Sequence, residues 1–95
     1  MKEYTIGILV VNPVTMLTLY VRTGCPFCEK VQQVITNFGI VVEEKNIANP
    51  DIARELIALG GKQQVPYLVD TDHNVAMYES DDIVAYLTEH YIAPK

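Results

Sequence analysis

Cysteine is scarce in this chain, which has two among its 95 residues, Cys25 and Cys28. A pair spaced so closely cannot form a disulfide framework that joins distant segments. It also provides too few ligands for a metal site of its own, so we expect no metal. The spacing therefore favours redox chemistry as the use of this pair.

Basic residues are also few, because 7 Lys and Arg stand against 12 Asp and Glu, for a formal net charge of -5. This balance opposes general attraction to nucleic-acid phosphates and to anionic membrane surfaces. We therefore expect neither nucleic acid nor a membrane as a partner.

No apolar run is long enough to cross a membrane. Residues 1–21 are mostly apolar, but Asn12 and Pro13 divide them into segments too short to span a hydrocarbon layer. The run 6–11 is short for the core of a secretory signal, and no small-residue cleavage pattern follows it. We expect a cytoplasmic protein.

Internal repeats, low-complexity tracts and Ser-rich linkers are absent, and 95 residues supply one core rather than two. With 49% hydrophobic and 20% charged residues, the chain can bury that core without disulfides. The one shift in composition separates residues 1–13 from the rest. We therefore expect an N-terminal extension over residues 1–13 and one folded domain over residues 14–95.

The domain begins with the signals of a strand followed by a helix. Residues 14–21 are β-branched, apolar or Tyr, with no Gly or Pro, which predicts a central strand buried on both faces. Beyond Pro26, apolar residues recur at helical spacing, and Gly39 suits a left-handed stop. These predict a helix over residues 26–38, with the apolar residues Phe27, Cys28, Val31, Val34, Ile35 and Phe38.

The next two elements are a strand and a helix. Residues 40–46 predict a strand parallel to the first, because a helix connects the two. Asn49 is a good N-cap and Pro50 is tolerated at the first helical position, so a helix begins there and ends at Gly60-Gly61. Its apolar face is expected to contain Ile52, Leu56 and Leu59.

The last part of the domain predicts a hairpin and a final helix. Two short apolar runs, 65–70 and 75–78, flank the turn signals at 71–74. Ser80 is expected to cap a helix, with acidic residues favourably placed in its first turn. The apolar face of that helix would be Ile83, Val84, Leu87 and Tyr91. The fold class is therefore α/β, a four-stranded mixed sheet with helices on both faces in the order βαβαββα.

The motif Cys25-Pro26-Phe27-Cys28 lies where a buried strand is followed by a helix. Cys25 should therefore occupy the exposed N-terminal end of that helix. There the helix dipole and free N–H groups stabilise a thiolate, and Arg22 or Lys62 could add positive charge. Cys28 falls one turn deeper on the same side. We expect Cys25 to be the nucleophile and Cys28 the resolving thiol.

Two other interpretations of these residues remain open. Both cysteines could be small buried hydrophobic residues without chemistry. A zinc or iron-sulfur site is weaker, because His73 and His90 are far along the chain and form no ligand pattern. We expect His73 in a solvated turn and His90 near the end of the last helix.

The run Leu19–Cys28, followed by Gln64-Val65-Pro66 and by Ser80-Asp81-Asp82, resembles the glutaredoxin family. The resemblance covers roughly residues 16–91. It implies a thioredoxin-like fold and a redox-active disulfide that reduces protein disulfides and glutathione mixed disulfides. It also implies that glutathione is the reductant and co-substrate. The implied protein partners are disulfide-containing or glutathionylated proteins, to which electrons are transferred.

The resemblance also implies the residues that bind glutathione. Pro66 matches a cis proline beside the nucleophile, so that Val65 could pair through its backbone with the cysteinyl part of glutathione. Ser80 and Asp81 match positions that receive the γ-glutamyl group at the start of the last helix. Lys62 and Gln64 could reach the glycyl carboxylate. Arg22 and Phe27, beside the cysteines, complete the implied site.

The chain departs from the glutaredoxin pattern at Tyr78-Glu79, where many of those proteins have a Gly pair. Glu79-Ser80 instead resembles the glutathione-binding pair in the N-terminal domains of glutathione transferases, which share the fold. Arg22 also replaces the Lys of many glutaredoxins. Two alternatives to a dithiol enzyme therefore remain: a glutathione-binding, transferase-like module, and an iron-sulfur carrier ligated through Cys25 and glutathione.

Overall fold

The computed structural model describes residues 17–92, so the expected extension over residues 1–13 and the first residues of the expected first strand lie outside the described residues. A four-stranded sheet has the strand order β3-β2-β4-β5. In chain order the elements are β2 (Leu17–Val21), α1 (Pro26–Phe38), β3 (Glu43–Asn46), α2 (Pro50–Gly60), β4 (Tyr67–Asp70), β5 (Val75–Met77), α3 (Ser80–Leu87) and the π-helix η1 (Thr88–Ile92).

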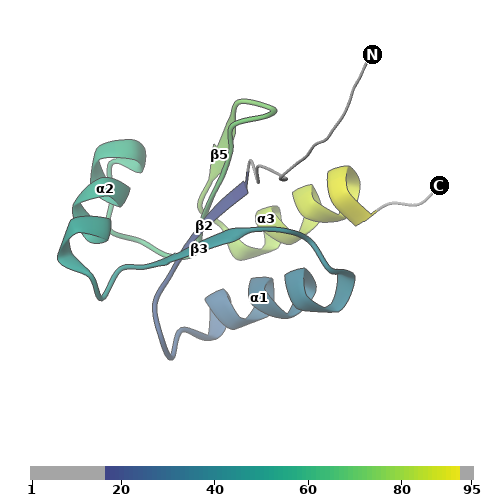
Figure 1. Ribbon diagram of the computed structural model, residues 1–95, viewed down its shortest axis with the longest axis horizontal. Helices are drawn as coiled ribbons and strands as arrows, with labels where there is room; N and C mark the ends of the chain where they lie inside the picture. The colour runs from purple at the N-terminus through teal and green to yellow at the C-terminus, as the bar shows by residue number, and fades with distance from the viewer. Residues whose placement is uncertain (1–16, 93–95) are drawn as a thin grey trace, which may run out of the picture.

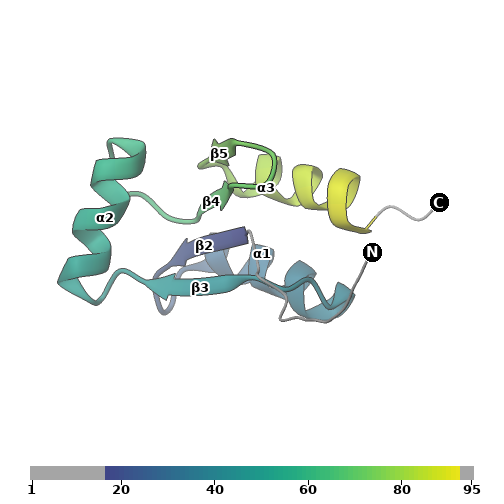
Figure 2. The same cartoon turned by 45° about the horizontal axis from the view of Figure 1, so that its top comes forward.

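The expected order of elements and the mixed sheet are confirmed. Strand β2 is central, parallel to β3 and antiparallel to β4, and β4 and β5 form the antiparallel hairpin. Strands β3 and β4 begin later than expected, at Glu43 and Tyr67, and β5 ends one residue earlier, at Met77. Helices α1 and α3 lie side by side, while α2 stands apart from both (Figures 1 and 2).

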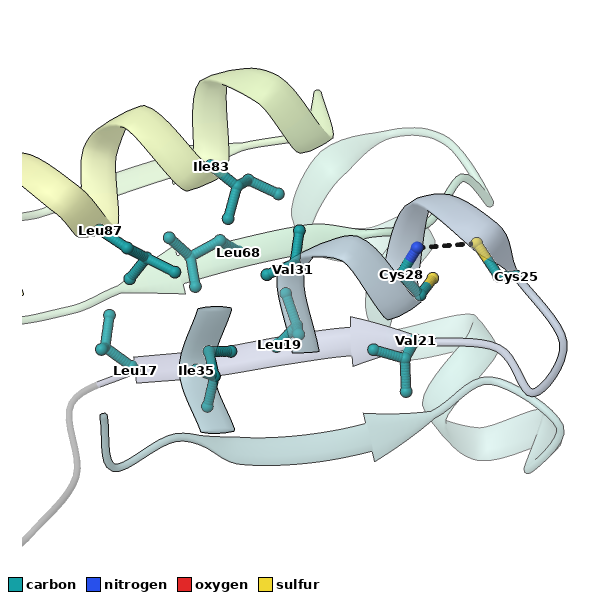
Figure 3. Packing of buried hydrophobic residues seen from close by; sticks show 10 residues of the cluster. All are labelled: Leu17, Leu19, Val21, Cys25, Cys28, Val31, Ile35, Leu68, Ile83 and Leu87. Carbon is teal, nitrogen blue, oxygen red and sulfur yellow. Dashed lines mark hydrogen bonds between the residues drawn. The ribbon is translucent and has the colours of Figure 1, made fainter. Parts of the chain in front are cut away.

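Alternation along β2 supplies a core to each face of the sheet. Leu19 and Val21 point into the larger core, together with residues of α1 and α3, whereas Tyr20 points into a smaller core with Leu56 of α2. Figure 3 shows the larger core, which contains Leu17, Leu19, Val21, Cys25, Cys28, Val31, Ile35, Leu68, Ile83 and Leu87. Helices therefore cover both faces of the sheet, as expected.

The two ends of α1 follow their sequence signals. Gly39 ends the helix in the left-handed conformation, with φ of 65°, and its N–H bonds to carbonyl groups of the last turn. Cys28, Val31 and Ile35 form the buried face. Phe27 and Phe38, expected on that face, are 63% and 59% exposed. Helical spacing placed them near the boundary of the apolar stripe, and both turn outward at the helix ends.

Helix α2 begins as predicted, because the Asn49 side chain accepts a hydrogen bond from the N–H of Asp51 at 2.9 Å. Leu56 is its buried contact with the sheet. Leu59, expected on the same face, is exposed. A hydrogen bond from the Tyr20 hydroxyl to the Glu55 carboxylate also ties the helix to the sheet.

The start and end of the last helical segment differ from expectation. Glu79, rather than Ser80, is the N-cap of α3, and it makes no side-chain capping bond. Ser80 is the first helical residue and is buried. After Leu87 the chain continues as η1, so Tyr91 lies in the π-helix rather than in α3.

Candidate functional site

Cys25 is the N-cap of α1, at the junction with β2. Its carbonyl accepts a hydrogen bond of 3.0 Å from the N–H of Glu29, the first turn of the helix. Its Sγ atom accepts a hydrogen bond of 3.2 Å from the N–H of Cys28 (Figure 3). The sulfur thus takes the position that a Ser or Asp oxygen occupies in an ordinary N-cap. A backbone donor aimed at the sulfur favours negative charge there.

The prediction that Cys25 is exposed was wrong, because the residue is only 3% exposed. The capping bond turns its sulfur back over the start of the helix, into the larger core beside Cys28. The neighbouring Phe27 side chain turns outward instead. Both cysteines are free thiols.

Cys28 is fully buried, one turn deeper than Cys25, as expected. Burial and a side-chain hydrogen bond to Cys25 raise the pKa of Cys28 to about 12, against an opposing effect of Arg22. Cys28 is therefore a neutral thiol at physiological pH. In that form it can donate a hydrogen bond to the Cys25 sulfur.

A hollow of about 340 Å³ adjoins the start of α1. The segment before β4 and the segment between β5 and α3 form its walls. It is lined by Phe27, Gln64, Val65, Pro66, Tyr78, Glu79, Ser80 and Asp81. The structure therefore brings together six of the predicted glutathione-binding residues: Phe27, Gln64, Val65, Pro66, Ser80 and Asp81. The Val65-Pro66 peptide bond is cis, as the resemblance implied.

The start of α3 supplies polar groups to this hollow. The first N–H groups of a helix have no partners within the helix, and the dipole makes this end favourable for an anion. Ser80, the first residue of α3, lines the hollow at the same place. Asp81, also in the first turn, pairs with Lys30 of α1, so its charge is already compensated. Glu79 forms no salt bridge with any of the residues 17–92.

The structure separates the two cations that the sequence placed near Cys25. Lys62 lies beside the hollow, with its Nζ atom 4.7 Å from the centroid of the Tyr78 ring. Arg22 instead lines a second hollow of about 360 Å³, formed by Val21, Arg22, Thr23, Gly24, Glu29, Gln32, Glu44 and Asn46. Neither Arg22 nor Lys62 is thus among the residues that line the hollow with the other six predicted glutathione contacts.

Two contributors to the site, Lys30 and Tyr78, were not predicted from the sequence. Lys30 is three positions after Phe27, so helical spacing puts both side chains on one face of α1, and this signal was available. Tyr78 was noted only as a departure from the glutaredoxin pattern. Its ring contact with Tyr67, at 4.4 Å between centroids, joins segments that no local pattern connects.

Neither a metal cluster nor a membrane-spanning helix occurs in the described part of the chain. Residues 17–92 contain no group of three or more His, Cys, Asp or Glu side chains that could hold a metal ion. None of their helices is long and apolar enough to cross a membrane.

The α/β domain has a cysteine at the start of its first helix and a cis proline in the adjoining hollow, which places it in the thioredoxin-like class of folds. Residues 19–95 match the family model described as the glutathione S-transferase N-terminal domain. The chain therefore belongs to the glutathione S-transferase N-terminal domain family. The thioredoxin-like fold that the glutaredoxin resemblance implied is confirmed. The family itself is that of the glutathione transferases, not specifically that of the glutaredoxins.

Solved structures agree with this assignment. The chain is similar to a glutathione S-transferase from the Antarctic clam Laternula elliptica, with 29% identity, a TM-score of 0.70, and coverage of 83% of this chain and 36% of that one. It is also similar to human glutathione S-transferase T1-1 in its apo form, with 26% identity, a TM-score of 0.69, and coverage of 82% and 33%. Glutathione transferase Omega 3C from Trametes versicolor shares the fold, with 21% identity, a TM-score of 0.72, and coverage of 87% and 37%.

The chain spans about a third of the length of these transferases. No curated protein sequence matches it.

Proposed function

We propose that this chain is a glutathione-binding module of the transferase type in which Cys25 is the reacting thiol, and that it transfers glutathione between thiols. The hollow lined by Val65, Pro66 and Ser80, next to the helix start that holds Cys25, carries this proposal. Family membership supports the ligand, and the cysteine motif supports the chemistry.

Each part of glutathione has a matching group around the hollow. Its γ-glutamyl carboxylate fits the Ser80 hydroxyl and the first N–H groups of α3, and its ammonium fits the Glu79 carboxylate. Its cysteinyl backbone can pair with Val65, whose N–H and C=O form no hydrogen bond within residues 17–92. The Lys62 ammonium is available for the glycyl carboxylate.

A thiol at this position favours disulfide exchange over conjugation. Conjugation requires a donor that stabilises the thiolate of bound glutathione, and a cysteine S–H is a weak donor. A cysteine thiolate instead attacks disulfide sulfur. The helix start and the Cys28 N–H support that thiolate at Cys25.

The reaction has two balanced exchanges. The Cys25 thiolate attacks the glutathione sulfur of a glutathionylated substrate, the substrate thiolate leaves and takes up a proton, and a Cys25-glutathione disulfide forms. A second glutathione thiolate then attacks the glutathione sulfur of that disulfide. This step releases oxidised glutathione and restores the Cys25 thiolate.

Reduction of protein disulfides by both cysteines is a second candidate function, favoured by the position of Cys28. The buried Cys28 thiol lies against the Cys25 sulfur, so it is placed to displace a substrate held there in a mixed disulfide. Its high pKa makes this displacement slow unless a base removes its proton. Glutathione transfer needs only Cys25 and is therefore preferred here.

The test compares two reactions in one preparation: removal of glutathione from a glutathionylated peptide, and conjugation of glutathione to an aryl halide. We expect the first to dominate and to disappear in the Cys25→Ser variant. Mass spectrometry after incubation with oxidised glutathione should show one glutathione on Cys25. Conjugation without deglutathionylation, retained in Cys25→Ser, would show that the reacting group is not Cys25.

A further inference from the structure

The Tyr78 side chain joins the two walls of the glutathione hollow. Its hydroxyl donates a hydrogen bond of 3.0 Å to the carbonyl of Lys62, and the N–H of Lys62 donates one of 3.2 Å to the same hydroxyl. Lys62 belongs to the segment that leads from α2 to Val65, whereas Tyr78 immediately precedes Glu79 and Ser80. One hydroxyl therefore fixes the distance between the walls.

The Tyr78 ring is itself held from the core. Its centroid lies 4.4 Å from that of Tyr67, and the Tyr67 centroid lies 5.9 Å from that of Tyr20. Both of these neighbours are buried. These two ring contacts link the hollow to the smaller core beneath α2, and they fix the position of the Tyr78 ring.

A glycine makes this close approach possible. A Cβ atom at Gly60, the last residue of α2, would lie 2.1 Å from the Tyr78 hydroxyl oxygen and 2.8 Å from the ring carbon that bears it. These distances are below any normal contact, so a side chain here would displace the Tyr78 hydroxyl from Lys62.

The Lys62 ammonium is held against the Tyr78 ring and has no anionic partner among residues 17–92. Its Nζ atom lies 4.7 Å from the Tyr78 ring centroid, within the range of a cation–π interaction. Within residues 17–92, Lys30, Lys45 and Arg54 each form a salt bridge, whereas Lys62 forms none. A cation that is fixed in place but not neutralised is suited to an external carboxylate.

We propose that Tyr78 is a positioning residue that holds Lys62 at the edge of the hollow and thereby sets specificity for the carboxylate of a thiol-containing peptide. This inference rests on the proposed function. Tyr78 acts on that carboxylate through Lys62, by two backbone hydrogen bonds and by the ring face. It fixes which peptide ligands bind and takes no part in the exchange at Cys25.

The experiment is a calorimetric titration with S-methylglutathione, which cannot form a disulfide, and with its glycyl ethyl ester, which lacks the carboxylate. The variants are Tyr78→Phe, which removes only the hydroxyl, Lys62→Met, and the double variant. Tyr86→Phe is the matched control, since its hydroxyl bonds to Asp70 instead.

We expect Tyr78→Phe to weaken S-methylglutathione binding by about three- to tenfold and to leave ester binding unchanged. In the Lys62→Met background the same substitution should have no further effect. Two results would overturn the proposal and show a structural role for Tyr78. One is an equal loss of affinity for both ligands in Tyr78→Phe. The other is that Tyr78→Phe weakens binding in the Lys62→Met background as much as it does in the unmodified protein. If Tyr78→Phe does not fold, Gly60→Ala is tested in the same way, because it displaces the hydroxyl without removing it.

The titration of the unmodified protein separates this proposal from the one on which it rests. No binding of either ligand would overturn both proposals. Binding of both ligands with equal affinity would leave glutathione binding intact and overturn the specificity assigned to Lys62 and Tyr78.

Discussion

The backbone N–H of Cys28 donates a hydrogen bond of 3.2 Å to the Sγ atom of Cys25. This bond makes Cys25 the N-cap of α1, and it places the two sulfur atoms in different environments. The Cys25 sulfur accepts a backbone hydrogen bond at the helix start, whereas burial raises the pKa of Cys28. The two thiols should therefore react differently although they are one helical turn apart.

The first prediction concerns reactivity against pH. A raised pKa means that Cys28 stays protonated, and therefore unreactive, until the pH approaches its pKa of about 12. In the Cys25→Ser variant, alkylation by iodoacetamide should be slow up to pH 10 in the folded protein and fast after denaturation. Peptide mapping identifies the modified residue. Rapid alkylation of folded Cys25→Ser near pH 8 would contradict the assigned environment of Cys28.

The second prediction separates the roles of the two cysteines. Cys25→Ser should lower deglutathionylation by more than about 100-fold, since the attacking sulfur is lost. Cys28→Ser should keep most of it, because a second glutathione resolves the intermediate. Reduction of a protein disulfide, in contrast, should fall in both variants.

Stability measurements provide the control for this comparison. Ser is a good N-cap, so Cys25→Ser should unfold at nearly the same urea concentration as the unmodified protein, whereas Cys25→Ala should lose about 1 kcal/mol. Activity that survives in Cys25→Ser but disappears in Cys28→Ser would reverse the assignment.

Sequence signals that act locally predicted most of the fold. Gly39 and Asn49 end or begin helices as their types suggest, and the apolar run of β2 is central in the sheet. The burial of Cys25 was not predicted, because it depends on which way one side chain turns at a helix end. The placement of Arg22 in another hollow depends on loop geometry.

Contacts between distant segments were also not predicted from the sequence. The Asp70 carboxylate was expected only as the end of a strand, yet its partners Tyr86 and Tyr91 are 16 and 21 positions away along the chain. Tyr91 was assigned to an apolar helix face. Its hydroxyl satisfies a buried charge, which the apolar pattern does not reveal.

The third prediction concerns the acidic residues at the start of α3. Because Lys30 already compensates Asp81, we expect the ligand ammonium to bind Glu79. Glu79→Gln should weaken S-methylglutathione binding about tenfold, and Asp81→Asn about twofold or less. Titration calorimetry measures both. The reverse order of effects would mean that the ligand displaces Lys30 and uses Asp81, as the glutaredoxin resemblance implied.

Asp70, at the end of β4, is fully buried and accepts hydrogen bonds from three side chains. Its Oδ2 atom lies 2.5 Å from the Tyr86 hydroxyl, 2.6 Å from the Tyr91 hydroxyl and 2.8 Å from Nδ1 of His73. Burial alone raises the pKa of Asp70, but these bonds outweigh it and lower the pKa from 3.8 to about 2. The carboxylate thus ties α3 and η1 to the hairpin.

The last prediction follows from the sign of that shift. A carboxyl whose pKa is lower in the folded state stabilises the fold above its unfolded pKa, near pH 4, and this stabilisation is lost as the pH falls towards 2. It amounts to about 2 kcal/mol. Asp70→Asn should therefore lower the free energy of unfolding by about 2 to 3 kcal/mol at pH 7, measured by urea unfolding, and this difference from the unmodified protein should shrink between pH 4 and pH 2.5.

The control is Asp72→Asn, on the same hairpin but 63% exposed at its side chain, which should change the free energy of unfolding by less than about 0.5 kcal/mol. Equal losses in the two variants, or a loss in Asp70→Asn that does not depend on pH, would show that the charge of Asp70 does not hold this end of the fold.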